Sequence, residues 1–420
     1  MKNPFLKKDF YKDVGTLIGG TGISQLIPIA VSPILTRIYT PEDFGVLAFF
    51  MAFTSILGVV ATGRYEMAIL MPKTDNNAKN LGALSFFIAT IISLATLIIF
   101  LLYGHQILTF LNFGIYTYLI FLIPIGIFAK SIFQIFTYTL NRVKHYKAIA
   151  GSKITRSIGG SGIQLGLGFL SFSSLGLVLG KLIGEILGCL YGFWITIRHK
   201  QYKNEKINWT KIQKLSKDYK EFPKYNAPHA FTNTASSNLP NILLASLFSS
   251  SIAGFYSLSH RVCFAPIQLI STSVQQVYSR SVTERFNEGK DIFEYSKSVF
   301  KQLSLLAIIP FTALLIFAPS LFEFIFGEEW RIAGVYSQFL TPFLYLVFVV
   351  SPITYLPLLL NKQRKAFAID VVYLILRVSA LGLGFLLGDA LLAIILFSAV
   401  GVIIQLYLLY WILSIAKQAS

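Results

Sequence analysis

An apolar hairpin near the N-terminus, residues 15–50 (GTLIGGTGISQLIPIAVSPILTRIYTPEDFGVLAFF), strongly limits how this chain can fold. Its first run of about twenty residues, at about 1.5 Å per residue, is long enough to cross the hydrocarbon core of a bilayer. The run breaks at residues 39–43 (YTPED), where Thr40 precedes Pro41 and two acidic residues. Proline and acids in a first turn predict a helix start. We therefore expect two membrane-spanning helices joined by a tight turn.

The composition of the whole chain agrees with this hairpin. The mean hydropathy is +0.65, with 55% hydrophobic and only 13% charged residues, whereas about a quarter of the residues of a soluble domain are charged. The chain is therefore predicted to be an integral membrane protein. Its two cysteines, Cys189 and Cys263, lie in separate apolar segments. They predict buried small side chains, with neither a disulfide framework nor a metal site.

The net charge of +17 is explained by orientation in a membrane. Lysine and arginine concentrate in alternate gaps between the apolar segments, beginning with the N-terminal KNPFLKK, and a binding site for nucleic acid is not needed to account for them. By the positive-inside rule both termini are cytoplasmic and the number of spans is even. The predicted spans cover residues 14–38, 42–63, 80–103, 115–140, 148–170, 174–197, 226–248, 252–279, 298–318, 335–360, 366–387 and 390–415.

Weak internal similarity predicts that the chain is duplicated. LTFLNFG at 108–114 resembles LFEFIFG at 321–327, and LGLGFL occurs at 165–170 and again at 381–386. Matches in the same order, a little over two hundred residues apart, predict an all-α integral membrane fold of about 12 transmembrane helices. Two six-helix lobes, 1–200 and 225–420, would be related by a pseudo-two-fold axis around a central cavity.

The segment 201–224 is predicted to be a basic amphipathic cytoplasmic linker between these lobes. Ile212, Leu215, Tyr219 and Phe222 recur at helical spacing, and lysines occupy the other faces. We expect a helix whose apolar face lies on the anionic inner leaflet. A solvated linker is the alternative.

Charged residues inside apolar spans cost at least about 2.5 kcal/mol at a helix centre, so they are candidates for function. Most of them are cations, which predicts a cavity for an anionic substrate such as a diphosphate. The alternative for each is a side chain that snorkels to the interface or pairs with carbonyl groups, and for Arg156 this alternative is favoured. Lys181 and Glu185, four residues apart on one face, are expected to neutralise each other. The candidates are Lys130, Arg156, Lys181, Glu185, Arg261 and Arg377.

Two further spans carry informative patterns. The sixth has a glycine at every fourth position from Gly176 to Gly192, which predicts close packing against another helix of the same chain. The seventh carries Asn233 and Asn238 ahead of Pro240. These asparagines either bind backbone groups that the proline frees or line a substrate cavity.

The sequence contains no GxxxxGK[ST] loop and no Cys/His or Ser/His arrangement suited to catalysis. We therefore predict that the protein is not an enzyme and needs no cofactor or metal. Glu185 or Glu66 could take up a coupling proton, although Glu66 in GRYE could instead form an ion pair with Arg64.

Four stretches resemble one family: GTLIGGTGISQLIPIAVSPILTRIYTPEDFG, ATGRYEMAILMPKTDNNAKNL, LNRVKHYKA and FGEEWRIAG. They are similar to Wzx-type O-antigen and capsule flippases of the multidrug/oligosaccharidyl-lipid/polysaccharide (MOP) exporter superfamily. This resemblance implies a MATE-like monomer in the bacterial inner membrane that moves an undecaprenyl-diphosphate-linked oligosaccharide outward. Membrane lipids, a polysaccharide polymerase and chain-length machinery would be its partners. The rival interpretations are an ion-coupled multidrug exporter and a non-transporting scaffold of polysaccharide assembly.

Overall fold

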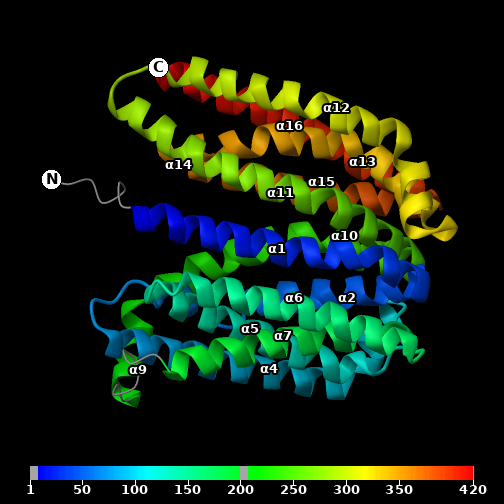
Figure 1. Cartoon of the computed structure of the whole chain (residues 1–420), viewed down its shortest axis with the longest axis horizontal. Helices are drawn as coiled ribbons and strands as arrows, with labels where there is room; N and C mark the ends of the chain where they lie inside the picture. Colours follow the sequence, from blue (N-terminus) through cyan, green and yellow to red (C-terminus); the bar gives the residue numbers. More distant parts are fainter. Residues whose placement is uncertain (1–7, 199–206, 420) are drawn as a thin grey trace. The chain divides into compact units, whose positions relative to one another are not determined.

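The computed structural model describes residues 8–198 and 207–419, with side chains from residue 19 onward, and these residues are helical without a strand (Figure 1). Twelve of the described helices have at least 18 residues. They are α1 (Lys8–Ile38), α2 (Pro41–Gly58), α4 (Asp75–Phe110), α5 (Leu119–Arg142), α6 (Tyr146–Phe169), α7 (Ser173–Arg198), α10 (Ala227–Leu247), α11 (Ser250–Asn287), α12 (Ile292–Phe326), α13 (Arg331–Val350), α15 (Gln363–Leu386) and α16 (Ala390–Ala419). The shorter elements are α3 (Tyr65–Ala68), α9 (Trp209–Asp218), α14 (Leu356–Leu359), the π-helical turn η2 (Phe222–Asn226) and the 3₁₀ turns η3 (Glu328–Trp330) and η4 (Ser351–Tyr355).

Eight helical segments in the described part of the chain are long and apolar enough to cross a membrane. They are α2, α4, α5, α7, α12, the run Glu328–Leu359 that contains α13, α15 and α16. Large apolar side chains such as Leu102, Ile309 and Phe324 are 64–83% exposed, as expected for surfaces that face lipid. The protein is therefore a multi-pass membrane protein. The helices α1, α6, α10 and α11 are long but more polar, so the count of 12 spans stays a prediction.

The turn between α1 and α2 has the local structure that YTPED predicts. Thr40 caps α2, accepting a hydrogen bond from the Asp43 backbone N–H, while the Asp43 carboxylate accepts one from the Thr40 backbone at 3.0 Å. This reciprocal capping box satisfies two amides that have no partner inside the helix. Glu42 also accepts a hydrogen bond from the Tyr116 hydroxyl at 2.5 Å. The predicted helix start is confirmed.

The chain forms two compact units, Met1–Ser250 and Ser251–Ser420. Helix α10 falls in the first unit because it packs against α2. Both LGLGFL sequences lie at a helix end near a residue with positive φ, but one position apart: Ser171 (61°) directly follows the first copy, and Gly388 (71°) is the second residue after the other. The division into six-helix lobes at 201–224 stays a prediction, and part of that segment, 199–206, lies outside the described residues.

Glycines bring α6 and α7 into contact in the first unit (Figure 1). A Cβ atom at Gly184 would lie 2.7 Å from both the Cα of Gly160 and the carbonyl oxygen of Arg156. A Cβ at Gly180 would lie 2.8 Å from the backbone nitrogen of Gln164. The backbones therefore approach more closely than any side chain would allow, which confirms the packing predicted from the glycine spacing.

This close approach predicts that Gly184→Ala is destabilising, because the new methyl group would meet backbone atoms that cannot move independently. The expected loss is about 1–3 kcal/mol of unfolding free energy. Gly162→Ala on α6 is the matched control, since nothing lies within 4 Å of its Cβ position. Thermal unfolding in detergent should give a lower midpoint for the Gly184 variant only, and equal midpoints for the two variants would contradict the prediction.

Helix α9 is amphipathic, as predicted, but its apolar face is not on the lipid. Ile212 and Leu215 are 2% and 5% exposed and pack against Leu81 of α4 and Ile135 of α5. The Tyr65 hydroxyl also donates a hydrogen bond to the carbonyl oxygen of Ser216 at 2.9 Å. The prediction that this face binds the inner leaflet is wrong, because the protein itself covers it.

Candidate functional site

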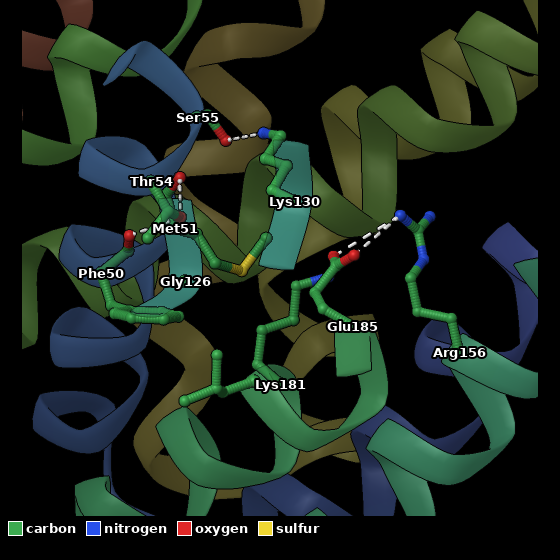
Figure 2. Close-up of a pocket in the computed structure, with 10 residues that line it drawn as sticks. Phe50, Met51, Thr54, Ser55, Gly126, Lys130, Arg156, Lys181 and Glu185 are labelled. Atoms are coloured by element: carbon green, nitrogen blue, oxygen red, sulfur yellow. Dashed lines mark hydrogen bonds and ion pairs between the residues drawn. The ribbon is translucent and has the colours of Figure 1, made fainter. Parts of the chain in front are cut away.

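A partly open cavity of about 230 Å³ with charged side chains in its lining lies within the first unit, between four of its long helices (Figure 2). Helix α2 supplies one wall, and α5, α6 and α7 supply the charged side chains. The residues that line it are Phe50, Met51, Thr54, Ser55, Gly126, Lys130, Arg156, Lys181, Leu182 and Glu185. Four of the charged residues predicted from the sequence are therefore brought together in one place.

Lys130 lies halfway along α5, where that helix packs closely on α2. A Cβ at Gly126, one turn earlier, would lie 2.7 Å from the Thr54 side chain, so glycine permits the approach. The Lys130 Nζ donates a hydrogen bond to the Ser55 Oγ at 2.7 Å (Figure 2). A neutral hydroxyl solvates the ammonium group without cancelling its charge.

Glu185 on α7 is the carboxylate of this cavity. Its oxygens lie 3.1 Å from the Lys181 Nζ and 3.3 Å from the Arg156 Nη1. The predicted pairing of Lys181 with Glu185 is confirmed. The preference for a snorkelling Arg156 is wrong, because this guanidinium pairs with Glu185 and lies 4.6 Å from the centre of the Phe133 ring.

The cavity has a net positive charge, since three cations share one carboxylate. Lys130 is attracted by Glu185 and repelled by Lys181 and Arg156. In a medium of low dielectric constant such an excess favours an anion with about two negative charges. The arrangement can bind an anion of this charge, such as a diphosphate.

The predicted asparagines of α10 are not part of this cavity. Asn233 is exposed, and the Asn238 Nδ2 donates a hydrogen bond to the carbonyl oxygen of Thr234 at 2.9 Å. Asn238 thus binds the backbone of its own helix, but the carbonyl that Pro240 leaves without a donor is that of Ser236, so neither of the two predicted roles is shown for Asn238. Pro240 lies buried inside α10 without ending that helix.

Glu66 is fully buried on the short helix α3, outside the long spans, and does not line the cavity. Its carboxylate accepts a hydrogen bond from the Thr62 hydroxyl and lies 3.3 Å from the Arg64 Nη1. The ion pair considered for GRYE is confirmed. Burial raises the pKa of this carboxyl, while the Thr62 hydrogen bond and the Arg64 charge oppose that rise.

Arg261 and Arg377 belong to the second unit, on α11 and α15. Arg261 is half-buried. Arg377 lies among aromatic rings, 4.0 Å from the centre of Tyr373 and 4.4 Å from that of Phe397. Within the described residues no cluster of His, Cys, Asp and Glu has the arrangement of a metal site.

The sequence did not identify the neutral members of the cavity. Ser55, Thr54 and Met51 are ordinary residues of a membrane helix, and only the fold shows that they face Lys130. Their spacing of three and four residues on α2 indicates one helix face, but the sequence does not say what that face meets.

Comparison with known proteins gives a family and a fold. Residues 34–333 match the model of a family described as polysaccharide biosynthesis protein. The solved structure of the lipid II flippase MurJ is similar, with a TM-score of 0.74 over 94% of this chain and 87% of that chain at 16% identity. The structure of an inward-facing MATE multidrug resistance transporter of the MOP superfamily is similar with a TM-score of 0.63 over 96% of both chains, at 13% identity. The Vibrio cholerae MATE transporter VcmN has a TM-score of 0.61 over 98% of this chain and 96% of that chain, at 14% identity. No curated protein sequence matches.

The fold is therefore that of the MOP superfamily, an all-α membrane architecture of two lobes, as the sequence predicted. The family model covers most of the length of the sequence. The chain belongs to the polysaccharide biosynthesis protein family.

Proposed function

We propose that this protein is a flippase. It moves an oligosaccharide linked to undecaprenyl diphosphate from the cytoplasmic to the periplasmic leaflet of the bacterial inner membrane. The observation that carries the proposal is the cationic cavity of Lys130, Arg156, Lys181 and Glu185 inside a membrane unit. A charged head group cannot cross hydrocarbon unaided, and a cavity with excess positive charge would shelter it.

The cavity suits the diphosphate rather than the whole head group. A volume of about 230 Å³ is too small for an oligosaccharide but has room for two phosphoryl groups. Lys130 is ready to bind, because its partner is a neutral hydroxyl. The guanidinium of Arg156 can grip two phosphate oxygens through parallel hydrogen bonds. The lipid tail would remain in the bilayer throughout.

Glu185 promotes release of the substrate from this site. A bound diphosphate competes with this carboxylate for Lys181 and Arg156, which both contact it now. When Lys181 and Arg156 bind the substrate instead, Glu185 loses both partners and becomes the carboxylate that can take up a proton. Glu66 keeps its Arg64 partner. The membrane potential also favours outward movement of an anion, by about 2.3 kcal/mol per charge per 100 mV.

Alternating access of the two lobes would supply the path. The protein works as a monomer in this proposal and delivers its product to a polymerase and chain-length machinery. A multidrug exporter is the rival, since several structural neighbours are MATE transporters. The charge of the cavity opposes that rival, because a cationic drug would meet three cations and a carboxylate already paired twice.

Reconstitution tests this proposal directly. The purified chain is placed in vesicles that carry a fluorescent undecaprenyl-diphosphate oligosaccharide, and movement between leaflets is followed by quenching from outside. We expect exchange well above that of protein-free vesicles, and no transport of a cationic dye under a proton gradient. Dye transport without lipid exchange would show a drug exporter, and the absence of both would favour a scaffold.

A further inference from the structure

Arg156, one of the three cations of the cavity, contacts an aromatic ring as well as a carboxylate. Its Cζ lies 4.6 Å from the centre of the Phe133 ring on α5. Its Nη1 lies 3.3 Å from a carboxylate oxygen of Glu185 on α7 (Figure 2). Arg156 itself belongs to α6, so side chains of two neighbouring helices determine where its guanidinium lies.

These two contacts use different parts of the guanidinium group. A cation–π contact is made by its flat face, whereas its hydrogen bonds are donated from its planar edge. With Phe133 on the face, the N–H edge stays available for Glu185 or for the oxygens of a phosphate. The Arg156 side chain is 29% exposed and lines the partly open cavity, so a ligand there can reach this edge.

A glycine makes room for the contact between Arg156 and Phe133. A Cβ atom at Gly188 on α7 would lie 2.9 Å from the Phe133 Cε2 and 3.0 Å from the Arg156 Cβ. Gly184, one turn earlier, faces backbone atoms of α6, whereas Gly188 faces these two side chains. A methyl group at Gly188 would therefore push the ring and the arginine apart without meeting the backbone of another helix.

Arg156 could extend in another direction if the ring were absent. A long cationic side chain in an apolar span tends to extend its charge toward the membrane surface. Such a conformation would take the guanidinium away from Glu185 and from the cavity. Phe133 is buried, and a desolvated cation–π contact is stronger than an exposed one. The ring therefore stabilises the conformation in which the charge stays at the cavity.

We propose that Phe133 and Gly188 are positioning residues for Arg156. Phe133 holds the flat face of the guanidinium, and Gly188 leaves the space in which the two side chains meet. Neither residue lines the cavity, so each acts on the substrate through Arg156. This inference rests on the proposed function, because it explains how Arg156 stays oriented when a diphosphate replaces Glu185 as its partner.

Fluorination of the Phe133 ring tests this contact while the packing stays nearly constant. Phenylalanine with one, two or three ring fluorines is incorporated at position 133, and each fluorine withdraws electron density from the face that the guanidinium contacts. Calorimetry measures the binding of inorganic pyrophosphate to the full-length protein in detergent. We expect the affinity to fall stepwise, to about three- to tenfold below wild type with three fluorines. Equal affinity throughout the series would overturn the role of Phe133.

Gly188→Ala tests the space between the two side chains. We expect it to weaken pyrophosphate binding about tenfold, because the new methyl group separates Arg156 from Phe133. Gly192→Ala is the matched control on the same stripe of α7, since its Cβ would meet Phe136, at 3.1 Å, instead of Arg156. This control should bind pyrophosphate as the wild type does. Equal weakening by the two variants would indicate a general loosening of α7 and would contradict the role of Gly188.

NMR of the ligand-free protein separates this proposal from the proposed function. The ring current of Phe133 should shift the Arg156 Nε–H proton upfield, and Phe133→Leu should remove that shift; Arg156→Lys identifies the signal. An unchanged Arg156 signal in Phe133→Leu would overturn the positioning role, whatever pyrophosphate does. If the shift is present but the wild type fails to bind pyrophosphate, the diphosphate site is wrong and the positioning of Arg156 stands.

Discussion

Replacing Glu185 with glutamine is expected to lower the unfolding free energy by about 3 kcal/mol. Glu185 is 8% exposed, and its carboxylate contacts both Lys181 and Arg156. Loss of this charge leaves these two cations and Lys130 unneutralised in a region of low dielectric constant. Removal of one partner from a buried ion pair typically costs 3–5 kcal/mol, and we take the low end because Lys181 and Arg156 are partly exposed. Denaturation of the purified protein in detergent measures the effect.

Two further variants make this prediction specific. In Arg156→Gln/Glu185→Gln one cation leaves with the carboxylate, so the double variant should be more stable than Glu185→Gln alone. Glu284→Gln on α11 is the matched control, since Glu284 pairs with Arg280 at 3.0 Å on an exposed surface. An exposed pair of this kind contributes at most about 1 kcal/mol. The account would be contradicted if Glu284→Gln lowered the unfolding free energy as much as Glu185→Gln does. It would also be contradicted if the double variant were less stable than Glu185→Gln alone.

The charged members of the cavity could be predicted from the sequence because of the cost of charge in a membrane. Lys130, Arg156, Lys181 and Glu185 are charged residues inside apolar spans, and the structure brings all four together. The reason is physical: a charge that cannot reach water is stabilised by another charge or by a polar cavity. Residues under the same constraint therefore tend to share one site.

The partners of these charges could not be predicted. Arg156 was expected to snorkel, but the fold places it beside Glu185 and over Phe133. Ser55 contacts Lys130 only because α2 and α5 meet at Gly126. Spacing along one helix gives the face of a side chain, whereas the identity of the neighbouring helix is a tertiary property.

Helix α9 shows the same limit outside the spans. Its helical period was visible in the sequence, since Ile212 and Leu215 are three residues apart on one face. A hydrophobic helix face beside lysines can pack against either a lipid surface or other helices of the protein. The sequence does not show that Leu81 and Ile135 are the residues that cover this face. The capping of α2 by Thr40 and Asp43, by contrast, depends on neighbouring residues only and was predicted correctly.

Lys130→Met is expected to slow lipid exchange in the vesicle assay about 30- to 100-fold while leaving the protein at least as stable as before. A charge-assisted hydrogen bond is worth about 1.5–3 kcal/mol, and about 2.7 kcal/mol corresponds to a hundredfold effect. Stability should not fall, because the variant removes a desolvated ammonium group and its repulsion from Lys181 and Arg156, and these gains outweigh the lost attraction of Glu185 and the lost Ser55 hydrogen bond. A loss of transport without a loss of stability would separate a binding role from a structural one.

Lys153→Met is the matched control for this experiment. Lys153 is a partly buried lysine of the same unit, and its Nζ donates a hydrogen bond to the neutral Thr21 Oγ1 at 2.9 Å, much as Lys130 does to Ser55. It lies one turn before Arg156 on α6 but does not line the cavity. We expect exchange close to the wild-type rate in this variant and an intermediate rate in Lys130→Arg, which keeps the charge in a larger group. Equal slowing by the Lys130 and Lys153 variants would mean that transport responds to the total charge of the unit, and the cavity would lose its role as the diphosphate site.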